Sequence, residues 1–162
     1  MKAFTHVDTS IGRLLLLGER REERLVLHGL FFARERHAAG RTADATEDAA
    51  LFAPFVRDEL VPFLAGQRTS FDVATAATGT PFQEEVWAAL RAIPYGTTTT
   101  YAELARRIGR PAAVRAVGTA NGRNPLSIIV PCHRVVGTDG ALHGYAGGLA
   151  AKTALLALEK RA

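Results

Sequence analysis

The chain has 162 residues, of which 48% are hydrophobic and 22% charged, a composition that builds an ordinary packed core and is too apolar for a disordered segment. No apolar run approaches the ~20 residues of a membrane-spanning helix, and the N-terminus lacks the apolar stretch of a signal peptide, so we expect a cytoplasmic protein without a membrane partner. The single cysteine, Cys132, excludes an internal disulfide and any zinc site built from several thiolates.

Charge is distributed unevenly along the chain. Residues 1–78 carry 10 basic and 11 acidic side chains, whereas residues 79–162 carry 10 basic and 5 acidic ones. Six arginines and one acid, Glu103, lie between Tyr101 and Arg134. This local excess suits a polyanionic partner, although charge alone slightly favours a solvated arginine-rich surface.

The first half of the chain is typical of a small α/β unit. Segments rich in β-forming residues follow one another, and a later stretch has the apolar spacing of a helix kinked near Pro54 or Pro62. A small-residue linker ends this half, which predicts an N-terminal α/β support domain, a small antiparallel sheet plus helix, over residues 1–78. The expected strands are 3–9, 12–19, 24–32 and 69–74, and the expected helix is 49–66.

The second half, residues 79–162, is predicted to be mainly helical. Thr80 with Gln83, and Thr100 with Glu103, have the spacing of capping boxes at two helix starts. A tight glycine-containing turn then joins two helices, which is typical of a helix-turn-helix, winged-helix-like DNA-binding domain. The expected helices are 80–93, 100–109, 112–122 and 149–162.

The helix expected over residues 112–122 consists largely of small residues, with Arg115 among them. Small residues allow close packing against another helix, but an unpaired buried guanidinium is costly, so we favour insertion of this helix into a DNA groove. The apolar segment 127–130 then predicts a short buried strand, with Cys132 just beyond its end.

Cys132 is either an inert buried residue or a reactive thiol. The thiolate is the nucleophilic form of cysteine, and cationic neighbours such as His133 and Arg134 favour it. Adjacent side chains point in different directions, so we expect a water rather than a direct bond between Cys132 and His133. A carboxylate would orient the imidazole, and Glu159 in the last helix is one candidate.

A series of short motifs adds a family resemblance to this reading. The segments "GTPFQEEVW", "IPYG", "YAELA", "RAVGTANGRNP", "IIVPCHRVVG", "GYAGGLAAK" and "LLALE" follow one another between Gly79 and Glu159. Their sequence and order resemble those of the O6-alkylguanine-DNA alkyltransferases. The resemblance covers about half of the chain and is specific, because several independent motifs occur together. It implies a single-turnover DNA repair protein that flips O6-alkylguanine out of the duplex and transfers the alkyl group to Cys132.

The resemblance also implies a role for each matching residue. His133 would take the thiol proton through a water, Glu159 would orient His133, Asn124 would tie the recognition helix to the cysteine segment, and Tyr101 would promote flipping. The substrate base would meet the Val135 carbonyl and the loop at Tyr145 and Ala146. The DNA-contacting residues would be Arg115, which fills the vacated stack, together with Tyr101, Ala113, Gly118, Thr119 and Arg123.

No cofactor or metal is implied. The expected partner is double-stranded DNA containing O6-alkylguanine, with O4-alkylthymine left open as a second lesion. We expect a monomer and leave cooperative binding to DNA open. Two departures from the family pattern stand out: Val114 where alanine is usual, and Ala146 where some members have serine.

Three alternatives were weighed. A non-enzymatic, alkyltransferase-like protein would bind the lesion without repairing it, but such proteins lack the acceptor cysteine. A transcription regulator with a redox thiol is disfavoured because Arg115 is the only long polar side chain on its helix available to read bases. A cysteine hydrolase lacks a visible independent histidine partnership.

Overall fold

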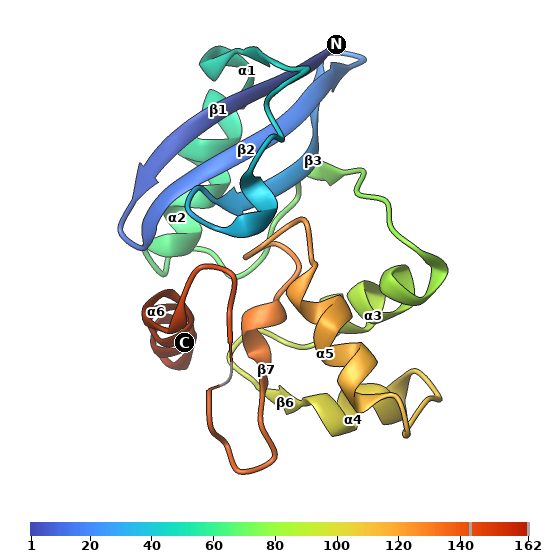
Figure 1. Ribbon diagram of the computed structural model, residues 1–162. Helices are drawn as coiled ribbons and strands as arrows, with labels where there is room; N and C mark the ends of the chain where they lie inside the picture. The colour runs from blue at the N-terminus through green and yellow to red at the C-terminus, as the bar shows by residue number, and fades with distance from the viewer. Residues whose placement is uncertain (143, 162) are drawn as a thin grey trace. The chain divides into compact units, whose positions relative to one another are not determined.

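Three long antiparallel strands, β1 (Lys2–Thr9), β2 (Gly12–Arg21) and β3 (Arg24–Phe32), form the centre of a five-stranded sheet in the first half of the chain (Figure 1). The four consecutive leucines 14–17 of β2 are all buried, as expected for the central strand of a sheet. The edges are the two-residue strands β4 (Thr46–Glu47) and β5 (Ala74–Thr75), each parallel to its neighbour. The strand predicted over 69–74 is therefore wrong except at its last residue, Ala74.

The helical segment after the sheet is interrupted by a π-helical turn. It consists of α1 (Ala49–Phe55), η2 (Val56–Leu60) and α2 (Val61–Leu64). Asp48 caps its start, since the carboxylate accepts from the Leu51 N–H. The Val61 N–H reaches back to the Val56 carbonyl. We attribute the wider turn to Pro62, which has no N–H to donate, so the expected kink is accommodated as a π-bulge.

The second half contains three helices that pack on one another, α3 (Pro81–Arg91), α4 (Tyr101–Arg107) and α5 (Val114–Gly122). The capping box at α3 is complete, because Thr80 and Gln83 exchange hydrogen bonds of 3.0 and 3.1 Å. At α4 only half of it forms. Thr100 accepts from the Glu103 N–H, but the Glu103 carboxylate binds Arg106. The helix-turn-helix arrangement of α4 and α5 is present.

The segment that leads to Cys132 is a turn rather than the predicted strand. Residues 127–130 are buried or half-buried as expected, but Ile128 has φ = +74°, which is incompatible with an extended strand. Only Leu126 bridges to β3, at Leu30. A short 3₁₀ helix, η3 (Cys132–Arg134), follows, and β7 (Val135–Val136) pairs in parallel with β6 (Thr99–Thr100).

The last helix is α6 (Leu149–Lys160), and a 3₁₀ turn, η1 (Arg36–Ala38), lies between β3 and β4. The computed structural model describes residues 1–142 and 144–161. The chain divides into one unit of 1–77 with 125–129, and a second of 78–124 with 130–162. Among the described residues, no helix has the length and apolarity needed to cross a membrane.

Candidate active site

Cys132 is the first residue of η3, and its side chain is buried. Its N–H donates to the Val130 carbonyl at 2.8 Å, and its carbonyl accepts from the Val135 N–H. The turn therefore fixes the backbone on both sides of the sulfur. A sulfur held in this way would need little reorganisation before a reaction.

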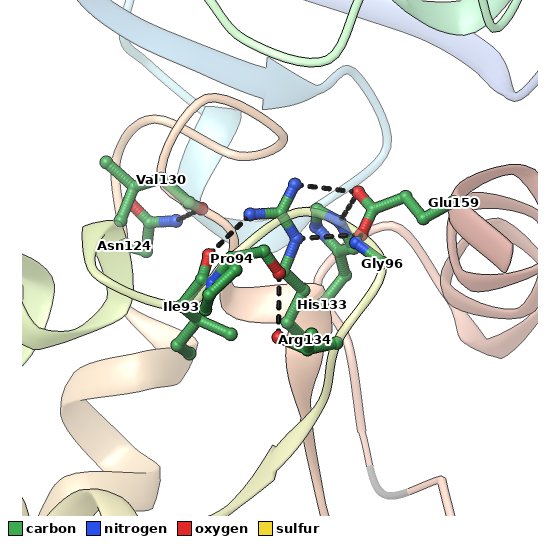
Figure 2. Close-up of polar contacts among 9 residues, drawn as sticks. Ile93, Pro94, Gly96, Asn124, Val130, His133, Arg134 and Glu159 are labelled. Atoms are coloured by element: carbon green, nitrogen blue, oxygen red, sulfur yellow. Dashed lines mark hydrogen bonds and ion pairs between the residues drawn. The ribbon is translucent and has the colours of Figure 1, made fainter. Parts of the chain in front are cut away.

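Asn124 connects the end of α5 to this turn. Its side-chain amide donates to the Val130 carbonyl at 2.8 Å and to the Cys132 sulfur at 3.3 Å. Figure 2 shows the first of these contacts. The Val130 carbonyl and the Cys132 sulfur both belong to buried residues. The amide therefore supplies a hydrogen bond that the buried carbonyl needs. It also places a donor beside the sulfur, which favours the thiolate form.

His133 and Glu159 form a buried pair, with 2.7 Å between Nε2 of the imidazole and Oε2 of the carboxylate (Figure 2). A carboxylate only accepts, so Nε2 carries the proton and Nδ1 presents a lone pair. Within residues 1–142 and 144–161, buried Nδ1 has no hydrogen-bond partner. Burial lowers the pKa of His133, although Glu159 acts to raise it. A neutral imidazole with an open Nδ1 is a ready proton acceptor.

Arg134 holds the same carboxylate, a contact that the sequence interpretation missed. Its Nε donates to Oε1 of Glu159 at 2.7 Å, its Nη2 to Oε2 at 2.9 Å, and its Nη1 to the Ile93 carbonyl at 2.8 Å. Although burial acts to raise it, hydrogen bonds from His133 and Arg134 lower the pKa of Glu159 to about 2. Arg134 thus keeps Glu159 ionised behind His133.

Lys152 is a second residue that was missed. Its side chain is completely buried, at 0% exposure, and its Nζ donates to the Val135 carbonyl at 2.7 Å. Burial lowers the pKa of Lys152, whereas the charge of Cys132 acts to raise it. Lys152 and Glu159 are seven residues apart, two turns on one face of α6. This spacing could have identified Lys152 from the sequence, because Glu159 was already a candidate site residue on the same face of the helix.

The remaining residues expected at the substrate base lie around the same turn. Tyr101, the first residue of α4, is half-buried, and its pKa is raised by burial and then by the charge of Cys132. Tyr145 meets the His133 ring edge-on, with 6.4 Å between the ring centroids. Ala146 is half-buried next to it. The Val135 carbonyl, expected to meet the base, also accepts from Lys152.

Apart from Tyr101, the residues expected to contact DNA lie on or beside α5. Arg115 and Thr119 on α5 are exposed, as is Arg123 just after its end, whereas Ala113 and Gly118 are half-buried. On its buried side, α5 is held by α3, because the Trp87 indole N–H donates to the Ala120 carbonyl at 2.9 Å. In the part of the chain that the structure describes, Arg115 takes part in no ion pair with an acid. Its guanidinium is therefore available to a partner.

The model of the DNA-binding domain of 6-O-methylguanine DNA methyltransferase matches residues 81–161. A methylated-DNA–protein-cysteine methyltransferase of Mycolicibacterium paratuberculosis is 46% identical over 161 residues, which is 99% of this chain and 94% of the relative. The chain belongs to the 6-O-methylguanine DNA methyltransferase family.

Solved structures of this family agree with the fold. The O6-methylguanine methyltransferase of Mycobacterium tuberculosis matches with a TM-score of 0.89 at 46% identity, covering 99% of this chain and 94% of that one. The M. tuberculosis OGT in complex with DNA matches with a TM-score of 0.88 at 45% identity, covering 98% and 93%. The predicted fold class, an α/β unit followed by a helical DNA-binding domain, is confirmed.

Proposed function

We propose that this protein repairs duplex DNA containing O6-alkylguanine by moving the alkyl group irreversibly onto Cys132. The observation that carries the proposal is the arrangement at η3, where Asn124 contacts a buried sulfur and the next residue is a neutral histidine held by Glu159. That arrangement supplies a fixed nucleophile and a nearby proton acceptor, which are the two groups that a direct displacement at carbon requires.

The reaction balances with the groups present. The Cys132 thiol gives its proton through a water to Nδ1 of His133, and Glu159 stabilises the imidazolium. The sulfur electron pair then forms a bond to the alkyl carbon as the carbon–O6 bond breaks. The electron pair of the broken bond moves into the purine, which becomes guanine by taking up one proton, and the His133 imidazolium releases the proton that the thiol gave up. A thioether is stable, so each molecule acts once.

The lesion must leave the base stack before the sulfur can reach it. We assign this step to α5, with Arg115 filling the vacated position and Ala113, Gly118, Thr119 and Arg123 along the groove. Tyr101 promotes flipping and donates towards the base. The flipped base is read by the Val135 carbonyl, whose second lone pair stays available beside Lys152. The loop at Tyr145 and Ala146 closes over the base.

The finer points of the partner also belong to this proposal. The proposed lesion is O6-alkylguanine and the proposed acting form is a monomer, while O4-alkylthymine as a second lesion and cooperative binding to DNA stay open. We assign a supporting role to residues 1–78 and a DNA-binding and alkyl-accepting role to residues 79–162. The cytoplasm is the proposed site of action. No observation favours the lesion-binding, non-enzymatic alternative over repair.

The test is a repair titration on duplex DNA. An O6-methylguanine placed in a restriction site blocks cleavage, and repair restores it. We expect the amount of restored DNA to plateau at one site per protein molecule, to be absent with Cys132→Ser, and to form much more slowly with Arg115→Ala. Repair that continues beyond one site per molecule would contradict the proposal, because a consumed nucleophile cannot act twice.

A further inference from the structure

A basic loop lies outside the residues used so far. It comprises residues 33–41, the first part of the connection from β3 to β4, with three arginines (Arg34, Arg36 and Arg41), one histidine and a single acid, Glu35. Asp44, later in the same connection, pairs with Lys2. All three arginines are exposed, whereas Glu35 is buried. The surface of the basic loop is therefore cationic, although its sequence contains an acid.

Contacts of Glu35 and Ala38 with the residues beneath hold the loop in this orientation. Ala38 packs in a cluster with Leu15, Leu17 and Phe31. The Glu35 carboxylate accepts from the Phe32 N–H at 2.6 Å, and the Glu35 carbonyl accepts from the Ala38 N–H at 3.1 Å. These contacts turn the acid and the apolar residue inward. The arginines that flank these two residues remain exposed.

Among the described arginines of the same unit, Arg34 and Arg36 of the loop and Arg24 of β3 form no ion pair, whereas Arg41 interacts electrostatically with Glu35. Arg20 and Arg57 each form an ion pair, with Glu23 and Asp58. Within the described part of the chain, neither Arg34 nor Arg36 forms one. Arg41 is held in place, because its Nε donates to the His37 carbonyl at 2.8 Å and its guanidinium lies 4.9 Å from the centre of the Phe31 ring.

We infer that the basic loop binds the phosphate backbone of duplex DNA as a second contact, independent of α5. Guanidinium groups match phosphate geometry and bind it without regard to sequence. A membrane surface fits less well, since interfacial binding also needs apolar side chains and the large exposed hydrophobic residues described, Met1, Val61, Val114 and Leu149, all lie outside the loop. DNA is the polyanion on which the family acts.

The experiment compares two double variants that remove the same charge. Arg34→Gln/Arg36→Gln removes unpaired arginines of the loop, and Arg20→Gln/Arg57→Gln removes paired ones from the same unit. Affinity for an undamaged duplex is measured across a salt series. Each phosphate contact contributes about 0.9 to the magnitude of the slope of log K against log salt concentration. We therefore expect the slope of the loop variant, which lacks two contacts, to fall in magnitude by about 1.8 and that of the control variant to stay almost unchanged.

The reaction with free O6-benzylguanine serves as the internal reference. Both variants should alkylate Cys132 with this base at the wild-type rate, which separates a failure of the loop contact from a failure of the alkyl-transfer proposal. Equal slopes in the two variants, whether unchanged or reduced, would overturn the inference. Loss of binding to phosphatidylserine vesicles with an unchanged DNA slope would also overturn it, by assigning the loop to a lipid surface.

Discussion

The Asn124 side chain donates to the sulfur of Cys132 at 3.3 Å, so one amide joins the end of α5 to the reactive residue. The same amide donates to the Val130 carbonyl. A single side chain thus links the end of the helix that carries Arg115 to the Cys132 sulfur. A substitution that displaces the end of α5 should therefore also displace the Cys132 sulfur, and the reverse.

Replacing Asn124 with alanine removes both donors. We expect the reaction of Cys132 with O6-benzylguanine to slow by about 10- to 100-fold, and stability to fall by about 1–3 kcal/mol because the buried Val130 carbonyl loses its partner. Single-turnover kinetics and urea unfolding measure the two effects. Asn121→Ala on the same helix is the control, and equal slowing in both variants would remove the special role of Asn124.

Glu159 should make stability depend on pH. Its folded pKa, about 2, lies below the ordinary value of 4.5, so its contribution is present above pH 4.5 and is lost as the pH falls through 2. Glu159→Gln leaves Arg134 buried without its charge partner, which should cost about 3–5 kcal/mol near neutral pH. Urea unfolding should show this deficit shrinking on acidification. Glu84→Gln, at an exposed acid without an ion pair among the described residues, should change little, and a deficit in Glu159→Gln that is independent of pH would contradict the assignment.

Lys152 should favour the thiolate form of Cys132. The buried ammonium lies at the same turn as the sulfur, and its removal takes away a positive charge from a poorly solvated site. We expect Lys152→Met to slow alkylation of Cys132 by iodoacetamide roughly tenfold near neutral pH and to move the pH midpoint upward, since one pKa unit is a tenfold change in the thiolate fraction. Lys160→Met, exposed on the same helix, is the control. A wild-type pH profile in Lys152→Met would exclude this role.

The contribution of Glu35 to stability should depend on pH in the opposite direction from that of Glu159. Burial raises its pKa to about 7 from 4.5, so its contribution to stability is fully present below pH 4.5 and is lost as the pH rises through 7. Glu35→Gln keeps an oxygen for the Phe32 N–H and carries no charge. Relative to wild type, the free energy of unfolding of Glu35→Gln should increase by about 1–3 kcal/mol as the pH rises from 4.5 to about 7, as measured by urea unfolding. Glu22→Gln supplies the exposed baseline, and parallel pH curves for Glu35→Gln and wild type would refute the prediction.

Local signals predicted the start of α3 and the three long strands, because capping and alternation are properties of neighbouring residues. The same signals failed at residues 127–130, where apolar β-branched residues suggested a strand. Ile128 instead adopts a left-handed backbone conformation. Bonds between β3 and this segment, from the Leu30 N–H to the Pro125 carbonyl and from the Ser127 N–H to the Leu30 carbonyl, hold the turn. Such long-range bonds leave no mark in the local sequence.

At the site, the motif around Cys132 identified the residues that the chemistry names, but it did not reveal their electrostatic support. Arg134 was interpreted as a cation beside the thiol, whereas its guanidinium is bound to Glu159 and Ile93. Lys152 lies in a helix rich in alanine and leucine, where a lysine usually faces solvent. Only the packing of α6 against η3 shows that it is buried.

The central claim is that Cys132 itself accepts the alkyl group. Intact-protein mass spectrometry after incubation with duplex DNA containing O6-methylguanine tests this most directly. The account predicts a mass gain of one methyl group per molecule, located on the peptide that contains Cys132 and absent in Cys132→Ala. An unchanged mass for the wild-type protein, or the same gain in Cys132→Ala, would contradict it.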